Sequence, residues 1–217
     1  QELKKKRSVN PNDNMKGSYL GPKFESNSIE IKLKSLNANY KKYGEDEVIN
    51  ILAKELSEEK TAGWFQGRME FGPRALGGRS ILADPRSSRM QKELNLKVKF
   101  RESFRPFAPS ILNEEVGNWF ELDEASPYML LVANIKKEIQ IPMTPEQENL
   151  FGIDKLNIKR SKIPSVTHID YSARVQTVHQ DTNPKYYKLL KRFNELTKCP
   201  ILVNTSLSVC FFCFVIN

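Results

Sequence analysis

The stretch GWFQGRMEFGPRALGGRSILADPRSSRMQKELNLKVKFRESFRPFAPS, residues 63–110, sets many arginines among glycines, prolines and apolar residues typical of a protein core. Its seven arginines are Arg68, Arg74, Arg79, Arg86, Arg89, Arg101 and Arg105. Arginine stays charged and offers five donors in a rigid fork, so a buried arginine needs a partner. The four carboxylates of the stretch are too few for this. We therefore expect a bound phosphate, carboxylate or nucleic acid to complete it.

The positive charge of the chain is concentrated in the same stretch. Of the formal net charge of +8, seven arginines and three lysines against four acids place +6 within residues 68–105. Such a focus favours a site for a small anion over a surface that follows a polyanion. The length of 217 residues, with 39% hydrophobic and 28% charged residues, suits one large domain or one domain with an extension.

Membrane and metal sites are not predicted. No apolar run approaches the roughly 20 residues that span a bilayer, and the N-terminus lacks the apolar region of a signal peptide. The three cysteines, Cys199, Cys210 and Cys213, form a single CxxC pair and no disulfide framework. We expect a reducing, cytoplasmic environment.

Apolar spacing and turn residues predict a mixed α/β (α+β) fold. Helices are expected over 45–60, 87–96 and 186–197, and strands over 61–66, 79–83, 128–135, 175–178 and 200–204. Residues 1–28 are interpreted as linker, and 136–164 as a variable loop or lid.

The glycine-rich segment GPRALGGRS, residues 72–80, is the first candidate site. Backbone N–H groups of such a loop can line an anion cavity, and Arg74 and Arg79 can clamp phosphate oxygens. A tight turn with surface arginines is the alternative, because short glycine-rich motifs often occur without function.

The segment KFRESFRPFAP, residues 99–109, is the second candidate. If it forms a strand, Lys99 and Arg101 share one face, and Arg105 follows after a bend. Three converging cations repel one another, which implies an anionic ligand. The alternative is a solvated basic face paired with Glu102.

Two further segments carry polar residues at positions suited to a ligand. Arg174 stands in a small, apolar setting, which suggests another anion contact, whereas His168 and Asp170 are interpreted as a polar pair that shapes a turn. The last predicted strand runs into Asn204 and Ser206, where an α/β sheet meets its ligands. A cap or turn is the alternative role for these residues.

Together these segments resemble the C-terminal domain of the carbamoyltransferases of the nodulation-protein and antibiotic O-carbamoyltransferase type. The resemblance covers about residues 19–207. It rests on YLGP (19–22), GWFQGRMEFGPRALGGRSILADPR (63–86), LNLKVKFRESFRPFAPS (94–110), SPYML (126–130), VTHIDYSARVQTV (166–178) and PILVNTS (200–206).

The resemblance implies a YrdC-like fold, with a twisted open sheet flanked by helices. It divides the chain into an extension or interdomain linker over 1–44 and a YrdC-like domain over 45–217 that is truncated at its C-terminus. It also implies an N-terminal actin-like domain, absent from this chain, that transfers the carbamoyl group.

The implied reaction joins carbamoyl phosphate and ATP, with Mg²⁺, into carbamoyl adenylate. Family positions assign Arg74, Lys99 and Arg105 to carbamoyl phosphate, with Lys99 and Arg105 catalytic. Arg101, Arg174, Asn204 and Ser206 are assigned to ATP, and no protein metal site is implied. A basic RNA-binding module and an inactive fragment are the alternative functions; focused charge ranks nucleic acid below the small ligands.

The chain departs from the family pattern at a few positions. Gly78 replaces an asparagine, and Tyr171 and Lys198 replace glycines. We expect Tyr171 to strain a tight backbone conformation that a glycine adopts freely. Ser208 replaces the asparagine of the SxN motif, and CFFCFVIN (210–217) replaces the usual continuation.

Overall fold

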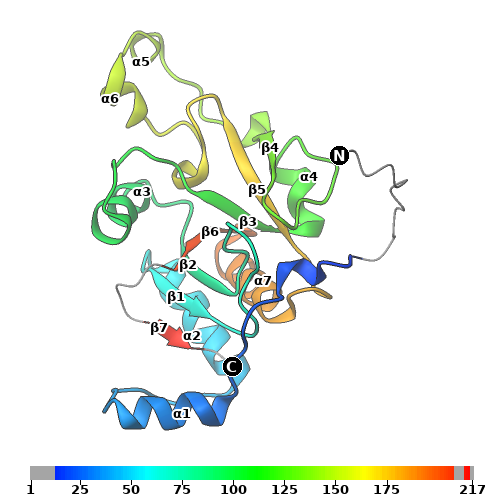
Figure 1. The fold of residues 1–217 in the computed structure, drawn as a ribbon. Coiled ribbons are helices and arrows are strands. Elements are labelled where there is room, and N and C mark those ends of the chain that lie inside the picture. Colours follow the sequence, from blue (N-terminus) through cyan, green and yellow to red (C-terminus); the bar gives the residue numbers. More distant parts are fainter. Residues whose placement is uncertain (1–12, 208–212, 216–217) are drawn as a thin grey trace, which may run out of the picture.

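The computed structural model describes residues 13–207 and the backbone of strand 213–215, which build an open mixed sheet in the order β4-β5-β3-β6-β2-β1-β7 (Figure 1). The strands are β1 (Ala62–Phe65), β2 (Arg79–Ala83), β3 (Ala108–Leu112), β4 (Leu131–Asn134), β5 (Ser172–Val178), β6 (Ile201–Ser206) and β7 (Cys213–Val215). β3 pairs in parallel with β5, and β7 with β1, whereas the other neighbours are antiparallel. The mixed α/β fold class is confirmed.

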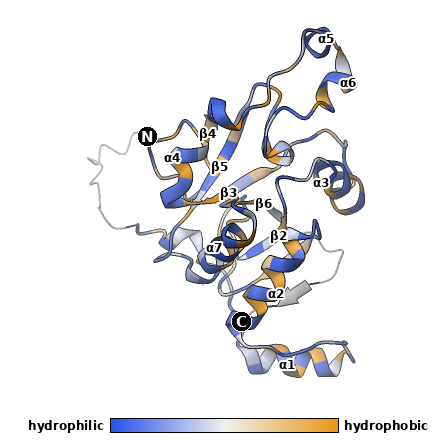
Figure 2. Cartoon of the chain, turned by 180° about the vertical axis from the view of Figure 1, so that it is seen from behind, coloured by the Kyte–Doolittle hydropathy of each residue, from blue (hydrophilic) through white to orange (hydrophobic). Residues whose placement is uncertain are grey.

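Helices α2 (Glu45–Ser57) and α7 (Pro184–Thr197) pack against each other on one side of this sheet (Figures 1 and 2). Their buried faces follow helical spacing, with Leu52 and Leu56 on α2 and Leu189 and Phe193 on α7. Burying each such side chain contributes roughly 1.5–3 kcal/mol. The two helices therefore cover one face of the sheet.

The remaining helices are short, apart from the exposed α1. They are η1 (Lys16–Ser18), α1 (Ser26–Ser35), α3 (Met90–Glu93), the π-helix η2 (Leu94–Lys99), η3 (Asn113–Glu115), α4 (Val116–Trp119), η4 (Lys137–Ile139), α5 (Pro145–Glu148), α6 (Gly152–Leu156) and η5 (Pro164–Val166). Figure 1 shows α5 and α6 projecting from the body, within the segment expected to be a loop or lid. None of the described helices is long and apolar enough to cross a membrane.

Most predicted elements are present, with two differences around residues 87–112. The helix expected over 87–96 begins only at Met90 and continues as a π-helix to Lys99. Strand β3 is absent from the predicted elements, and its five residues are all buried. Residues 18–21 contact the glycine-rich loop, since the Tyr19 hydroxyl donates to Leu76 O at 2.6 Å. The division at residue 44 stays a prediction.

Both family glycine positions that lie within the described residues have left-handed backbone. Tyr171 has a φ of 64° and Lys198 a φ of 59°, which confirms the expected conformation at Tyr171. Lys198 follows the last turn of α7, where its N–H donates to Asn194 O. Side chains with a Cβ are disfavoured in this region, so both residues strain the chain locally.

Replacing Lys198 with glycine is expected to raise the free energy of unfolding by about 1 kcal/mol, because the strain at the end of α7 is relieved. Lys198 is exposed and loses no packing. Urea unfolding measures the change. The matched control Lys191→Gly, at an exposed position inside α7, is expected to lower stability by about 1 kcal/mol. A loss of stability in Lys198→Gly would contradict the expectation.

Candidate functional site

The glycine-rich loop between β1 and β2 is closed around a carboxylate of the chain itself. Glu70 is only 6% exposed, and its Oε1 accepts from the backbone N–H groups of Leu76 and Gly78, each at 2.7 Å, and Arg79 at 3.2 Å. These are the groups predicted to line a cavity for a bound anion. That prediction is wrong, because Glu70 already occupies their donors.

Arg79 holds the same loop through contacts within the fold. Its guanidinium donates to the carbonyls of Gln66 at 2.8 Å and Gly67 at 3.2 Å. It also lies 3.5 Å over the centre of the Phe65 ring. The predicted phosphate clamp by Arg79 is therefore wrong: backbone carbonyls and an aromatic face satisfy it.

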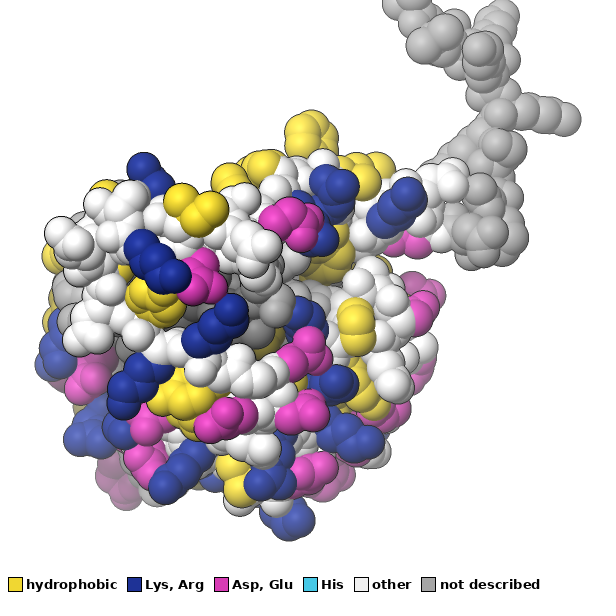
Figure 3. All heavy atoms as spheres, turned by 90° about the horizontal axis from the view of Figure 1, so that it is seen from below, with side chains coloured by type: hydrophobic (Ala, Val, Ile, Leu, Met, Phe, Trp, Pro, Cys, Tyr) yellow, Lys and Arg dark blue, Asp and Glu magenta, His cyan; other side chains and the backbone are white. Residues whose placement is uncertain are grey.

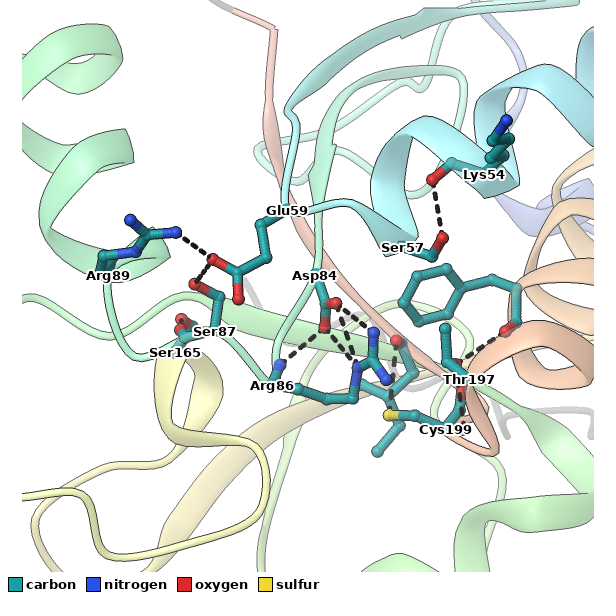
Figure 4. A network of polar contacts seen from close by, with 12 residues as sticks. Lys54, Ser57, Glu59, Asp84, Arg86, Ser87, Arg89, Ser165, Thr197 and Cys199 are labelled. Carbon is teal, nitrogen blue, oxygen red and sulfur yellow. Dashed lines mark hydrogen bonds and ion pairs between the residues drawn. The ribbon is translucent and has the colours of Figure 1, made fainter.

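Other arginines of the stretch are paired within the fold (Figure 4). Arg86 donates through two nitrogens to the buried carboxylate of Asp84, at 2.6 Å for the closer contact. Arg89 contacts Glu59 at 2.7 Å, and Glu59 also accepts from the Ser87 hydroxyl. The expectation that a ligand must supply the missing anions was thus too broad. Backbone carbonyls, together with the carboxylate of Glu59 from outside the stretch, supply many of the acceptors that these arginines need.

Lys99 brings the end of the π-helix to the end of β6. Its Nζ donates to the Ser206 hydroxyl at 3.1 Å and also contacts the Ser206 carbonyl oxygen. The strand on which Lys99 and Arg101 would share one face does not form, because Lys99 ends η2 and Phe100 turns the chain with a φ of 49°. Two residues assigned to different substrates on sequence grounds are therefore in contact.

Asn95 organises the loop that carries the next two cations. Its side-chain amide, fully buried, donates to Arg105 O at 2.8 Å and to Ser103 O at 3.1 Å, and it accepts from Arg101 Nε at 2.6 Å. Arg101 also lies 4.9 Å from the centre of the Phe107 ring. Sequence analysis missed Asn95, although a polar residue at a helix position flanked by leucines was a signal for it.

The three cations of this loop act on one another electrostatically. Burial lowers the pKa of Lys99, and the neighbouring Arg101 lowers it further. Burial also lowers the pKa of Arg101, with Arg105 adding to the effect. Arg105 pairs with Glu102 at 2.9 Å, as the solvated alternative predicted. An exposed ion pair such as Arg105–Glu102 neutralises little of the charge of this loop. Lys99, Arg101 and Arg105 together therefore keep a positive potential next to Ser206.

Arg74 and Arg174 form a second group of cations. Arg74 is exposed on the glycine-rich loop, and Arg174 is half-buried on β5, with a guanidinium nitrogen 3.9 Å from Met129 Sδ. Burial lowers the pKa of Arg174, and Arg74 lowers it further. Within residues 13–207 neither arginine forms an ion pair with an acid, so this pair retains the unbalanced charge that sequence analysis predicted for the whole stretch.

The remaining candidates lie in or beside the sheet. Asn204 is buried on β6 and joins the glycine-rich loop to β5. Asp170 accepts from Ser172 N at 3.0 Å and from its hydroxyl, which agrees with the turn role expected of the His168–Asp170 pair. Cys210 and the side chain of Cys213 lie outside the described residues, as does Ser208. Within the described part of the chain, no group of three or more His, Cys, Asp or Glu side chains is placed to hold a metal ion.

Neither the groove between α2 and α7 nor the charge distribution seen on the face in Figure 3 adds residues to this site. A groove of about 320 Å³ runs between α2 and α7 and holds none of the predicted site residues. Figure 3 shows a face on which lysines and arginines are interspersed with acids, without one continuous basic surface. That face does not resemble the continuous basic tracks along which proteins bind nucleic acid.

The family model described as "Carbamoyltransferase C-terminus" matches residues 53–215. The chain belongs to the carbamoyltransferase C-terminus family. This match covers each of the predicted site residues, from Arg74 to Ser206, and continues through β7. The family resemblance found in the sequence is thereby confirmed.

Relatives in the carbamoyltransferase C-terminus family are much longer than this chain. The protein sll1178 of Synechocystis is 57% identical over 96% of this chain and 34% of its own length. Nodulation protein NolO of Bradyrhizobium diazoefficiens is 36% identical over 90% of this chain and 33% of its own length. A 3'-hydroxymethylcephem-O-carbamoyltransferase of Streptomyces clavuligerus is 37% identical over 72% of this chain and 26% of its own length. The chain spans about a third of the length of the first two relatives.

Proposed function

We propose that this chain binds carbamoyl phosphate and ATP and forms carbamoyl adenylate, as one part of a carbamoyltransferase. The observation that carries the proposal is the contact between Lys99 and Ser206, with Arg101 and Arg105 close enough to shift the pKa values in this group. Positive charge and a hydroxyl donor meet where two anionic substrates need to be brought together. The name of the Streptomyces relative, an O-carbamoyltransferase, supports the reaction class.

The chemistry needs the cations to offset repulsion between the two substrates. Carbamoyl phosphate releases carbamate and inorganic phosphate on hydrolysis. A carbamate oxygen then attacks the α-phosphorus of ATP, and the bond to pyrophosphate breaks as the new O–P bond forms. Cations fixed in place stabilise the charge that develops on the phosphoryl oxygens. Mg²⁺ bound to the nucleotide would offset the charge of the pyrophosphate.

Each substrate takes residues from both groups of cations. Lys99 and Arg105 bind carbamoyl phosphate and stabilise the reacting phosphoryl group, with Arg74 from the glycine-rich loop. Arg101, Arg174 and Ser206 contact ATP. A separate N-terminal, actin-like domain would take the carbamoyl group onward to its acceptor, with the reaction occurring in the cytoplasm.

Exchange of labelled pyrophosphate into ATP tests the proposal directly. The chain is expected to catalyse exchange only when carbamoyl phosphate and Mg²⁺ are both present, because exchange requires reversible formation of the adenylate. Calorimetry with ATP, carbamoyl phosphate and a single-stranded RNA provides the comparison. Binding of both small ligands without RNA supports the proposal. Binding of RNA alone would replace it with a nucleic-acid module, and binding of none would indicate an inactive fragment.

A further inference from the structure

Asn204 has a buried polar atom that the fold leaves without a hydrogen bond. The residue is 2% exposed, and its Nδ2 donates to Ala75 O at 3.0 Å and to Gln176 Oε1 at 2.8 Å. Its Oδ1 is buried and has no donor within the described residues. Buried acceptors are almost always paired, so an orphan among site residues requires an explanation.

The orientation of the Asn204 amide is fixed by its neighbours. Backbone carbonyls only accept, so Ala75 O requires the NH₂ group of Asn204 on its side. Leu76 O likewise takes the NH₂ group of Gln176 at 2.8 Å, which leaves Gln176 Oε1 to accept from Asn204 and from the Ser110 hydroxyl. Rotating the Asn204 amide by half a turn would place its Oδ1 against two other acceptors, Ala75 O and Gln176 Oε1. Its Oδ1 therefore needs a donor from elsewhere.

Arg174, on the same face of the sheet, has a buried donor that lacks an acceptor in the described part of the chain. It precedes Gln176 by two positions on β5, so both side chains leave the strand on the side that carries the Asn204 amide. Its Nε is buried and has no acceptor among the described residues. Asn204 Oδ1, an acceptor without a donor, and Arg174 Nε, a donor without an acceptor, thus lie on this face, on strands separated only by β3.

We propose that Asn204 Oδ1 accepts a hydrogen bond from the amino group of the carbamoyl moiety, whose carbonyl oxygen faces Arg174. The inference rests on the proposed function and replaces the ATP contacts expected for Asn204 and Arg174. Phosphate oxygens at neutral pH offer acceptors and cannot satisfy Oδ1. The ribose hydroxyls and the adenine amino group of ATP also offer donors, and equal binding of the two acyl phosphates in the test below would favour them as partners of Oδ1. The carbamoyl group is small and supplies both a donor and an acceptor.

This assignment makes Asn204 a specificity-determining residue against other acyl phosphates. Acetyl phosphate matches carbamoyl phosphate in size and charge, but a methyl group replaces the NH₂. It would leave Asn204 Oδ1 unpaired and place an apolar group against it. Sites built to pair a substrate N–H reject analogues that lack it.

Competition calorimetry of the full chain with carbamoyl phosphate, acetyl phosphate and inorganic phosphate tests the inference. We expect carbamoyl phosphate to bind at least about tenfold more tightly than acetyl phosphate, the effect of one hydrogen bond of about 1.4 kcal/mol. Equal binding of the two acyl phosphates would overturn the inference and leave the proposed function intact. A chain that binds none of the three ligands would instead contradict the proposed function.

Two variants test whether Asn204 Oδ1 causes the preference for carbamoyl phosphate over acetyl phosphate. Asn204→Leu keeps the approximate volume and removes the acceptor, so the preference for carbamoyl phosphate should vanish while binding of inorganic phosphate persists. Ser110→Ala removes a hydroxyl from the same buried cluster without touching Oδ1, and it should retain the preference. Should Asn204→Leu fail to fold, the wild-type comparison of the two acyl phosphates still decides. A full preference in folded Asn204→Leu would show that Oδ1 binds only a water molecule.

Discussion

Replacing Lys99 with methionine is expected to lower carbamoyl-phosphate-dependent exchange of pyrophosphate into ATP by at least about 100-fold. Methionine keeps most of the unbranched stem but removes the ammonium that contacts Ser206. The substrate phosphoryl oxygens then lose a cation set where charge develops in the transition state. Exchange is measured with labelled pyrophosphate at saturating ATP, so that weakened binding does not imitate lost chemistry.

Lys97→Met is the matched control for this prediction. Lys97 lies two residues earlier on η2 and is exposed, and its ion pair within residues 13–207 is with Glu93, at 3.9 Å. Its replacement changes the net charge equally and should leave exchange within about twofold of wild type. Lys99→Arg should restore part of the activity, because a guanidinium supplies charge in a different shape. Wild-type exchange in folded Lys99→Met would remove Lys99 from the mechanism.

Periodic spacing predicted the elements whose burial is decided locally. Helices α2 and α7 follow the apolar repeats of their sequences, and β2 and β6 follow short apolar runs bounded by turn residues. The strain at Tyr171 was also predictable, because a glycine position in a family motif implies a positive φ. These features depend on a few neighbouring residues.

The arginine-rich stretch shows what local reasoning misses. Counting carboxylates within the stretch ignores backbone carbonyls, which satisfy Arg79, and acids far along the chain, such as Glu59 with Arg89. Neither kind of partner is visible in composition. The site that remains is smaller than predicted, and Arg74 with Arg174 and the Lys99 loop are its cationic parts.

The loop of Lys99 illustrates a second limit. The two-residue spacing of Lys99 and Arg101 would place both on one face of a strand, but the chain forms a π-helix whose end is held by the Asn95 amide. A π-helix has no sequence periodicity of its own over so few residues. Only tertiary contacts, here those of Asn95 with Arg101 and Arg105, decide between the two conformations.

Replacing Glu70 with alanine is expected to lower the free energy of unfolding by about 3–5 kcal/mol, because three N–H groups lose their common acceptor and each unsatisfied group costs roughly 1–3 kcal/mol. The donors are those of Leu76, Gly78 and Arg79. A loss of this size is a large part of a typical domain stability of about 5–15 kcal/mol. Urea unfolding followed by circular dichroism measures it.

Glu70→Gln tests how much of the stability depends on the negative charge of Glu70 and how much on the position of its oxygen. The glutamine keeps an oxygen for the same N–H groups but gives up the negative charge, so the expected loss is smaller, about 1–2 kcal/mol. Glu124→Ala removes an exposed acid elsewhere and should change stability by less than about 0.5 kcal/mol. Equal stability of Glu70→Ala and Glu124→Ala would mean that the loop does not depend on this carboxylate. Because the same loop carries Arg74 and the carbonyls that orient Asn204 and Gln176, the predicted order of stabilities should also be the order of carbamoyl phosphate affinities.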